Sequence, residues 1–431
     1  MINILKYILK NLAKLTLWRY KPDIIAITGS VGKTSTKEAI YAVLSVSGRR
    51  ARKSGGNLNN ELGVSLTILG NWSEKDLEMV SLWQPAGKKK IRKLFFWLKV
   101  ILFSFLRVIF LPKYFYPKIL ILEYGADRSG DIKKLLEIAK PKIGVVTAVG
   151  EIPVHIEFYS GLEAVIREKA KLVENMSVND FAVLNFDDES VTEIKEKTRA
   201  KTMTFGFNEG AKIKIINFEN YFGTANELTG VSFKIEHNGN VVPIKIKNTF
   251  GRPNAYAAGA AACVGLIYGL NLVRICEALS SNYHPAKHRM NIFAGVNGSW
   301  VIDDSYNASP ISMKAALETL ADIKTGSEAR KIAVLGDMLE LGEYSSKAHK
   351  SIGKLSAGIV DFLIVVGEEG KIIAETAVLN GLAKDKILSF NTAEEAAKTI
   401  KNIIKKGDII LVKASRGIGL DKVVEEIAVI V

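Results

Sequence analysis

The stretch that most constrains this chain is DIIAITGSVGKTSTKE, residues 23–38. Its apolar run at 24–27 predicts a buried strand, and a glycine turn, a lysine and two hydroxyl side chains follow before a helix-forming segment. A strand that passes through such a turn into a helix is a typical unit of a parallel α/β sheet. The segment therefore predicts an α/β fold organised around this turn.

The turn has the composition of a phosphate site. Gly29 and Gly32 allow backbone N–H groups to approach an anion, the positive end of the helix beginning near Lys33 points at it, and Lys33 adds a full charge. Thr34 is suited to binding Mg²⁺. The usual P-loop pattern has a glycine where this chain has Ile27, so the loop is a tighter variant, G-x-x-G-K-T. An ordinary strand-to-helix turn is the alternative, but the flanking strand and helix favour nucleotide binding.

Length and charge limit the classes of function. The chain has 431 residues, 48% hydrophobic and 24% charged, which suits two or three packed domains. Cys263 and Cys276 lack the spacing of a zinc site or a disulfide framework, and a reducing cytoplasm is expected. The net charge of +14 implies an anionic partner, which can be a nucleotide, a nucleic acid or a membrane surface. No RNP signature, zinc finger or basic tail occurs, so we expect no nucleic acid partner.

Residues 1–19 predict a cationic amphipathic helix. Lys6, Lys10 and Lys14 recur at four-residue spacing among leucines and isoleucines. A secretory signal would need an uninterrupted apolar region and a small-residue cleavage site, and the segment has neither. Packing on the body of the protein and lying on a membrane surface are both open interpretations.

A second basic segment, residues 88–117, combines bulky apolar and aromatic side chains with sparse lysines and arginines. Its apolar part from Leu94 to Leu111 is short for a membrane span, and Lys99 and Arg107 would each cost about 2.5–3.5 kcal/mol at the bilayer centre. We therefore expect an interfacial helix rather than a transmembrane one. The alternatives are a helix that covers an apolar patch of the protein and a dimer contact.

Strand and helix patterns alternate from residue 118 to 149, and the first of these strands ends in Glu123. A carboxylate at the carboxyl end of a strand beside a P-loop is where a Mg²⁺ ligand is expected. His155 follows on a loop, and Lys169 lies fourteen residues later in a helical segment. From spacing alone, both would be ordinary solvated side chains.

Three asparagines, Asn57, Asn59 and Asn60, form a polar turn ahead of an apolar segment. Such clustered amides can hold a polar ligand, or they can cap the following helix. The sequence alone leaves both readings open.

Later residues predict a second α/β unit, which begins with a strand near residue 299. We expect a cationic helix at 1–20 and a central P-loop ATPase domain with a mostly parallel sheet at 21–284, carrying the insert 88–117. A Rossmann-like α/β domain is expected at 285–431.

Seven stretches together resemble the Mur ligases, a family of ATP-dependent enzymes that form amide bonds in peptidoglycan precursors. The resemblance is strongest to the members that add D-alanyl-D-alanine to UDP-N-acetylmuramoyl-tripeptide. The stretches run in the family's order, and they are ITGSVGKTSTKE, GNLNNELGVSLTIL, ILEYGADRSGDI, GRPNAY, VIDDSYNASPISMKAAL, AVLGDMLELGEYS and VKASRGIGL.

The resemblance implies roles for individual residues. The residues that it places on ATP are Gly29, Ser30, Val31, Gly32, Lys33, Thr34, Ser35, Asn254, Arg289, Asp304 and Asn307. The residues that it places on Mg²⁺ are Thr34, Glu123, His155 and Lys169, the last as a carbamate that turns a cation into an anionic ligand. It makes Lys33, Glu123, His155 and Lys169 the catalytic set, with Asn57, Asn59 and Asn60 as substrate contacts.

The activity implied is peptide ligation through an acyl phosphate, with ATP and Mg²⁺ as cofactors and a muramoyl tripeptide and D-alanyl-D-alanine as substrates. The alternatives are a ligase of the same superfamily with another acceptor, such as a lipid-linked muropeptide or a folylpolyglutamate-like or cyanophycin-like substrate. A membrane-associated P-loop switch is disfavoured, because no N-K-x-D base-reading motif occurs.

Two departures from the family are expected. The phosphate loop begins after about 28 residues, so we expect the usual N-terminal UDP-binding domain to be absent, and the insert 88–117 is foreign to the family pattern. Because two cationic amphipathic segments are present, the cytoplasm is the expected location, with association at the inner face of the membrane through 1–19 and 88–117 as a variant.

Overall fold

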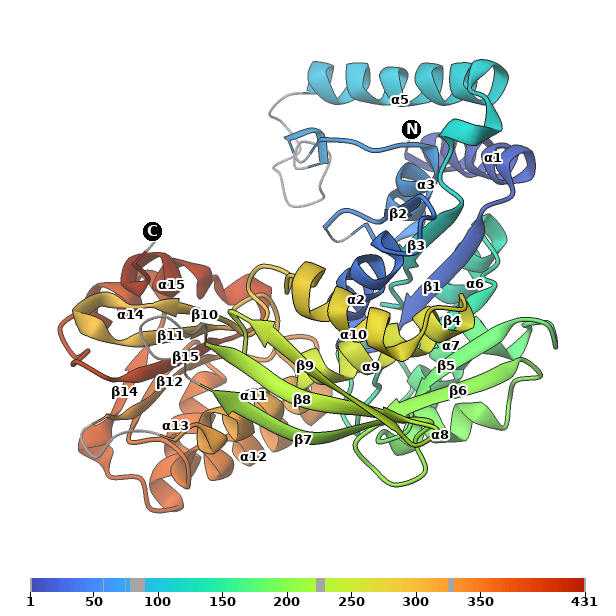
Figure 1. Cartoon of the computed structure of the whole chain (residues 1–431). Helices are drawn as coiled ribbons and strands as arrows, with labels where there is room; N and C mark the ends of the chain where they lie inside the picture. The colour runs from blue at the N-terminus through green and yellow to red at the C-terminus, as the bar shows by residue number, and fades with distance from the viewer. Residues whose placement is uncertain are drawn as a thin grey trace.

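The structure of the protein is a computed structural model that describes residues 2–56, 58–73, 75–77, 90–221, 229–324 and 329–429. Two α/β units, each built on its own sheet, lie side by side (Figure 1). This architecture confirms the predicted fold class, a mostly parallel central sheet followed by a second α/β unit. The predicted domain boundary at 284/285 stays a prediction, and the second sheet begins shortly after it with β10, Asn291–Ala294.

The first sheet has nine strands in the order β2-β3-β1-β4-β5-β6-β7-β8-β9. The first six are parallel. β1 lies between β3 and β4, and its apolar residues are buried, as expected for a central strand of a parallel sheet. The parallel strands are β1 (Asp23–Thr28), β2 (Ala51–Lys53), β3 (Ile119–Glu123), β4 (Ile143–Val146), β5 (Phe181–Asn185) and β6 (Lys201–Gly206).

Three longer strands extend this sheet beyond β6. β7 (Ile213–Tyr221) pairs with β6 in parallel, and β8 (Gly230–His237) and β9 (Asn240–Lys247) follow in antiparallel pairing. A register shift between Ile216 and Glu219 interrupts the alternation of β7, which removes the period of two that marks a strand.

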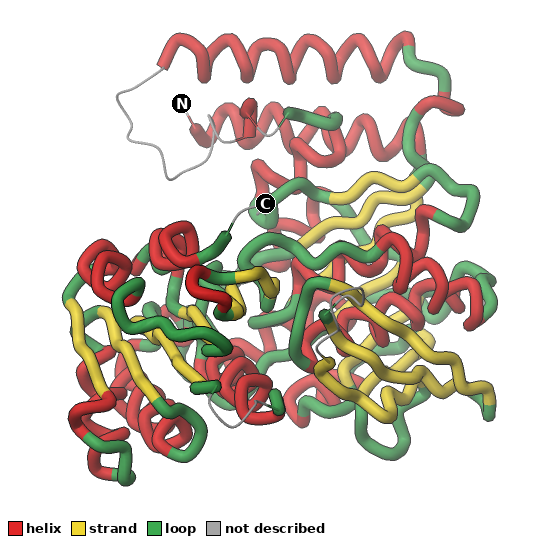
Figure 2. Tube along the Cα trace, turned by 60° about the vertical axis from the view of Figure 1, so that its left-hand side comes forward, coloured by secondary structure: helices red, strands yellow, loops and turns green. Residues whose placement is uncertain are grey.

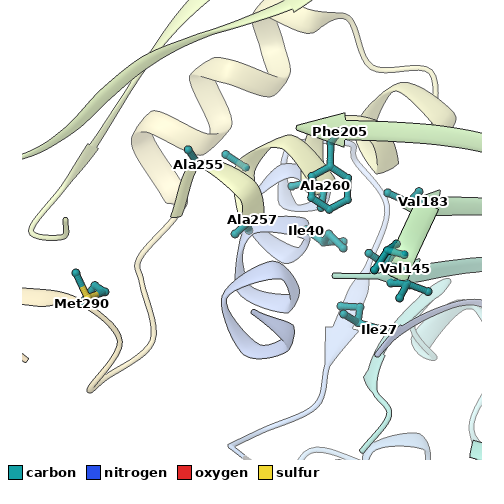
Figure 3. Close-up of a cluster of buried hydrophobic side chains, with 14 of the residues drawn as sticks. Ile27, Ile40, Val145, Val183, Phe205, Ala255, Ala257, Ala260 and Met290 are labelled. Atoms are coloured by element: carbon teal, nitrogen blue, oxygen red, sulfur yellow. The ribbon is translucent and has the colours of Figure 1, made fainter. Parts of the chain in front are cut away.

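Helices cover both faces of the sheet and enclose its core. In Figure 3, Ile27, Val145, Val183 and Phe205 of the strands point towards α2 and the alanine-rich α9. The small side chains of α9 allow it to pack closely on α2 and the sheet. The helices of this unit are α2 (Lys33–Ser45), α3 (Glu61–Leu69), α6 (Asp131–Ile138), α7 (Leu162–Glu174), α8 (Glu189–Lys195), α9 (Arg252–Ile267) and α10 (Leu272–Asn282).

The second sheet has the order β10-β11-β15-β12-β13-β14, in which only β10 is antiparallel. Its other strands are β11 (Trp300–Asp303), β12 (Lys331–Gly336), β13 (Phe362–Val366), β14 (Ile387–Phe390) and β15 (Ile409–Lys413). The helices that cover it are α11 (Pro310–Asp322), α12 (Ser345–Ala357), α13 (Gly370–Leu379), α14 (Ala393–Ile400) and α15 (Asp421–Ile427).

Both basic segments form helices at the edge of the first unit. α1 (Ile2–Tyr20) packs on the body, with Leu9 and Ala13 fully buried and Lys6 and Lys10 paired to acidic side chains of α3 and α6. α5 (Lys90–Phe110) lies outside α1 at the periphery in both views (Figures 1 and 2). Within the described residues, no helix is long and apolar enough to cross a membrane.

Candidate active site

A cleft of about 2550 Å³ separates the two units and opens at the carboxyl ends of β1, β3 and β4. Open α/β sheets bind ligands at this edge, where neighbouring strands lead in different directions. Asn57 lies outside the described residues. The predicted site residues that line the cleft are Gly29, Ser30, Val31, Gly32, Lys33, Thr34, Ser35, Asn59, Asn60, Glu123, His155, Lys169, Asn254, Arg289, Asp304 and Asn307.

The glycine turn is held against the end of β4. The Ser30 N–H donates to the Ala148 carbonyl at 2.6 Å, and the Thr147 hydroxyl donates to the Val31 carbonyl at 2.6 Å. A Cβ on Gly29 would lie 2.0 Å from Thr147 Oγ1, and φ at Gly29 is +145°, so only glycine fits there. The turn is therefore fixed by packing before any ligand binds.

Lys33 bridges the glycine turn from the first residue of α2. Its Nζ donates to the carbonyls of Gly29 at 2.6 Å and Ser30 at 3.2 Å. Burial lowers the pKa of Lys33, and the charge of Arg289 lowers it further while Glu123 opposes the shift. A cation at the amino end of a helix attracts a phosphate. No ion pair connects Lys33 to an acidic side chain in the part of the chain that the structure describes, so its charge is available to a polyphosphate.

Glu123 and Thr34 form the pair that a magnesium ion would use. Glu123 ends β3 and is buried, and the Thr34 hydroxyl lies 3.2 Å and 3.4 Å from its two carboxylate oxygens. Lys37 Nζ lies 3.7 Å from the same carboxylate. Among the residues described, no group of three or more His, Cys, Asp or Glu side chains is placed so that it could hold a metal ion without other ligands. One carboxylate and one hydroxyl fit Mg²⁺ that takes its remaining ligands from water and phosphate oxygens.

His155 connects the two units. It follows β4 in a left-handed backbone conformation, φ +66°, and its Nε2 lies 3.3 Å from Asp127. Its Nδ1 lies 2.5 Å from Glu340, which follows β12 of the second unit. Burial lowers the pKa of His155, against the raising effect of Asp127 and Glu340. Because a lowered pKa favours the neutral imidazole, the ring is suited to metal ligation.

Lys169 is buried in the middle of α7 and faces the cleft. Burial, and then the nearby charge of Lys33, lower the pKa of Lys169 from 10.5 to about 7. The adjacent Glu168 accepts hydrogen bonds from the backbone N–H groups of Gly130 at 2.9 Å and Ile132 at 2.8 Å. Glu168 therefore binds the amino end of α6 and positions α7.

The second unit contributes a buried ion pair to the cleft. Asp304 follows β11, and Lys413 at the end of β15 donates to its carboxylate at 2.5 Å and to the Asn307 carbonyl at 2.9 Å. Burial raises the pKa of Asp304. Arg289 lies over the Tyr306 ring at 4.2 Å. These contacts hold the loop after β11 facing the glycine turn.

The predicted amide contacts are used largely by the protein itself. Asn254 is buried, donates to Thr249 at 2.8 Å, and accepts from the Tyr283 hydroxyl at 2.9 Å. Asn60 accepts a hydrogen bond from the Gly63 N–H at 3.0 Å and so caps α3, as one of the two interpretations of the asparagine turn predicts. Asn59 lines the cleft and accepts from Gly125 through its carbonyl at 2.8 Å.

Three residues of the site were not singled out from the sequence: Asp127, Glu340 and Lys413. Asp127 and Glu340 contact His155 from separate segments, and Lys413 pairs with Asp304. All three lie within stretches that resemble the family, ILEYGADRSGDI, AVLGDMLELGEYS and VKASRGIGL. That placement was the only signal available, because no spacing rule connects them.

Two family models match the chain. The Mur ligase middle domain matches residues 27–80 and 113–265, and the Mur ligase glutamate ligase domain matches 288–416. The middle-domain match thus omits residues 81–112, which contain α5.

Several relatives align over almost the whole chain. UDP-N-acetylmuramoyl-tripeptide--D-alanyl-D-alanine ligase of Bacillus subtilis is 28% identical over 97% of this chain and 79% of its own. The ligase of the same name from Mycobacterium leprae is 30% identical over 92% of this chain and 72% of its own. The crystal structure of MurF ligase from Thermotoga maritima in complex with ADP superposes with a TM-score of 0.75 at 26% identity, covering 97% and 82% of the two chains.

Proposed function

Because this chain belongs to the Mur ligase family, we propose that it is an ATP-dependent ligase of peptidoglycan precursor synthesis that joins D-alanyl-D-alanine to a muramoyl tripeptide. The observation that carries the proposal is one cleft that brings together the glycine turn, Glu123, His155 and Lys169 with Arg289 of the second unit. The similarity to ligases of this name over more than nine-tenths of the chain supports the choice of substrates.

The reaction forms an acyl phosphate. A carboxylate oxygen of the tripeptide attacks the γ-phosphorus of ATP, and the bond to the bridging oxygen breaks, which releases ADP. The amine of D-alanyl-D-alanine then attacks the acyl carbon, loses a proton and expels phosphate. Lys33 and the backbone N–H groups of the turn stabilise the charge of the transferred group, because they are fixed before the substrate arrives.

Magnesium would be held by Thr34 and Glu123, with His155 and a carbamate on Lys169 as further ligands. When bound, it supplies positive charge to the phosphate oxygens. Burial lowers the pKa of both His155 and Lys169 and so favours their neutral forms. A neutral His155 can bind a metal ion, and a neutral Lys169 amine can react with carbon dioxide.

The second unit completes the site. Glu340 contacts His155, and the positive charge of Arg289 is close enough to Lys33 to lower its pKa. Residues of both units therefore surround the proposed γ-phosphate position. We propose that opening and closing of this cleft admits substrates and excludes water, as domain closure does in other phosphoryl-transfer enzymes.

A lipid-linked muramoyl peptide is a second candidate substrate. Two basic amphipathic helices at one edge of the protein, from segments 1–19 and 88–117, would bring the cleft to a membrane surface where such a substrate is found. A folylpolyglutamate-like acceptor has less support, since the solved structure of folylpolyglutamate synthase from Mycobacterium tuberculosis shares the fold with this chain at only 15% identity.

The test is ATP turnover against a panel of muramoyl-peptide and dipeptide pairs. ADP release should require both the tripeptide and D-alanyl-D-alanine, and omission of either should reduce it to background. Substrate-independent hydrolysis of GTP would instead indicate a P-loop switch, and turnover with a glutamate acceptor would indicate a different ligase of the superfamily.

A further inference from the structure

The outward face of α5 is unusually apolar for a helix on a protein surface. Nine large side chains on it are between 40% and 72% exposed. They are Leu94, Phe95, Leu98, Leu102, Phe103, Phe105, Leu106, Ile109 and Phe110. With 100° per residue, seven of them fall in a sector of about 120° that contains no charged residue. The exposed apolar area is on the order of 1000 Å², above the roughly 300–600 Å² of the largest patch on a typical monomer.

The face of α5 that meets the protein is the more polar one. Phe96 and Val100 are buried in a cluster with α1 and α3, but Ser104 is buried beside them. Arg107 also points inward, where it donates to the Leu69 carbonyl at 2.9 Å and lies over Trp72 at 6.0 Å. The helix is thus anchored through a face that mixes polar and apolar side chains, Trp97 and Ile101 among them, and most of its large apolar side chains point outward, the reverse of an ordinary surface helix.

The net charge of the chain is concentrated in two stretches of the sequence, which contain α1 and α5. Residues 1–22 contain five basic residues and no acidic one, and residues 79–122 contain nine basic residues and no acidic one. These fourteen charges equal the net charge of +14, so the remaining 45 lysines and arginines are balanced by 45 aspartates and glutamates. The outward face of α5 therefore belongs to the part of the chain that attracts anions.

Basic and aromatic groups border the apolar face. Arg92 and Lys99 are exposed along one side of it, and Lys99 Nζ also lies 3.7 Å from Asp76. Beyond the carboxyl end of α5, Lys113 is exposed, and Tyr114 and Phe115 are 74% and 61% exposed. Lysine, arginine and aromatic side chains favour the headgroup region of a bilayer, whereas long apolar side chains favour the acyl chains below it.

We propose that the outward face of α5 binds the surface of a bilayer that contains anionic lipids, with the helix axis in the plane of the membrane. Binding buries the apolar side chains below the headgroups and places the basic side chains beside lipid phosphates. A second copy of the chain fits less well, because a twofold contact would bring this acid-free segment against itself and oppose like charges. The proposal is independent of the ligase reaction, since α5 lies outside the segments that match the family.

Sedimentation of the full chain with vesicles tests the proposal. The probe is phosphatidylcholine with about 30% phosphatidylglycerol, compared with phosphatidylcholine alone. The variant Leu98→Gln/Leu102→Gln/Ile109→Gln removes three aliphatic side chains at the centre of the face, each about half exposed. We expect at least a tenfold lower partition coefficient for this variant, and weaker binding of the wild type to neutral vesicles and at high salt.

The matched control is Val178→Gln/Val378→Gln/Leu379→Gln, which replaces three exposed aliphatic side chains elsewhere on the surface. It should bind vesicles within twofold of the wild type, and both variants should keep the wild-type melting temperature and ATP turnover on a soluble substrate. The proposal is overturned by a wild-type chain that does not sediment with anionic vesicles, or by equal binding of the α5 variant. A dimer in analytical ultracentrifugation that the α5 variant abolishes would also overturn it, because a second copy would then cover the face.

Discussion

The buried lysine of α7 offers the most quantitative prediction. Reaction with carbon dioxide requires the neutral amine, and burial with the nearby charge of Lys33 lowers the pKa of Lys169 to about 7. At pH 7.5, such an amine is about three-quarters neutral, whereas an ordinary lysine is neutral in about one molecule in a thousand. Lys169 thus presents roughly 750-fold more of the reactive form, and carbamate formation, which releases one proton, should select it over other lysines.

The assay starts from enzyme freed of carbon dioxide by degassing at pH 6. Labelled ¹³C-bicarbonate is then added, and the carbamate signal is followed by NMR together with ATP turnover. Because the charged form dominates below the pKa and the neutral form above it, the rate of carbamate formation should rise about tenfold between pH 6 and pH 8 at equal carbon dioxide. Turnover should recover with the signal.

Two variants on the same helix separate the proposed role from general effects. Lys169→Met should lose both the signal and turnover. Lys171→Met should retain them, because Lys171 lies two residues away, is partly exposed and pairs with Glu168 at 2.6 Å. A carbamate signal that persists in Lys169→Met, or turnover that is indifferent to bicarbonate, would refute the reasoning.

Three further changes test the rest of the site. Lys33→Met removes preorganised positive charge and should reduce kcat/KM for ATP by roughly 100- to 1000-fold, as measured by steady-state kinetics. Its Tm should change little in a thermal melt, because the Lys33 amine bonds backbone carbonyls, not acidic side chains, among the described residues. Asp304→Asn leaves Lys413 buried without its anion and should lower the free energy of unfolding by about 3–5 kcal/mol in urea titration, whereas an unchanged midpoint would contradict the pairing. Gly29→Ala places a Cβ against Thr147 and should weaken binding of an ATP analogue in calorimetry; wild-type affinity would show that the turn relaxes freely.

Much of the fold could be predicted because its signals are local. The apolar run of β1, the glycine turn and the start of α2 are adjacent in sequence, and the structure has them as predicted. Short or irregular elements gave no such signal. β14 has four residues, none fully buried, and α10 begins with a cap at Asn271 that was not recognised.

The site was predictable where its parts lie at the carboxyl ends of neighbouring parallel strands. Glu123 could be placed beside Thr34 because both follow adjacent parallel strands. His155 and Lys169 required the family resemblance, since their neighbours depend on how separate segments pack. The contact between His155 and Glu340 joins two units, and nothing local to either residue predicts it.

The two basic helices were also predictable only as local elements, and the partners of their faces were not. Both were predicted as amphipathic, and the structure has both as helices. The periodicity of α1 could not choose between the protein and a membrane, and ion pairs of Lys6 and Lys10 now connect it to the body. For α5, the sequence did not reveal that Arg107 points inward and that most of the large apolar side chains point outward.

Transfer of an oxygen atom from peptide to phosphate tests the central claim most directly. A muramoyl tripeptide labelled with ¹⁸O in both oxygens of the reacting carboxylate is turned over with ATP and D-alanyl-D-alanine, and the released phosphate is analysed by mass spectrometry. An acyl phosphate requires one ¹⁸O atom in each phosphate released, because the attacking carboxylate oxygen leaves with the phosphorus. Phosphate that carries no label while amide product accumulates would contradict the mechanism.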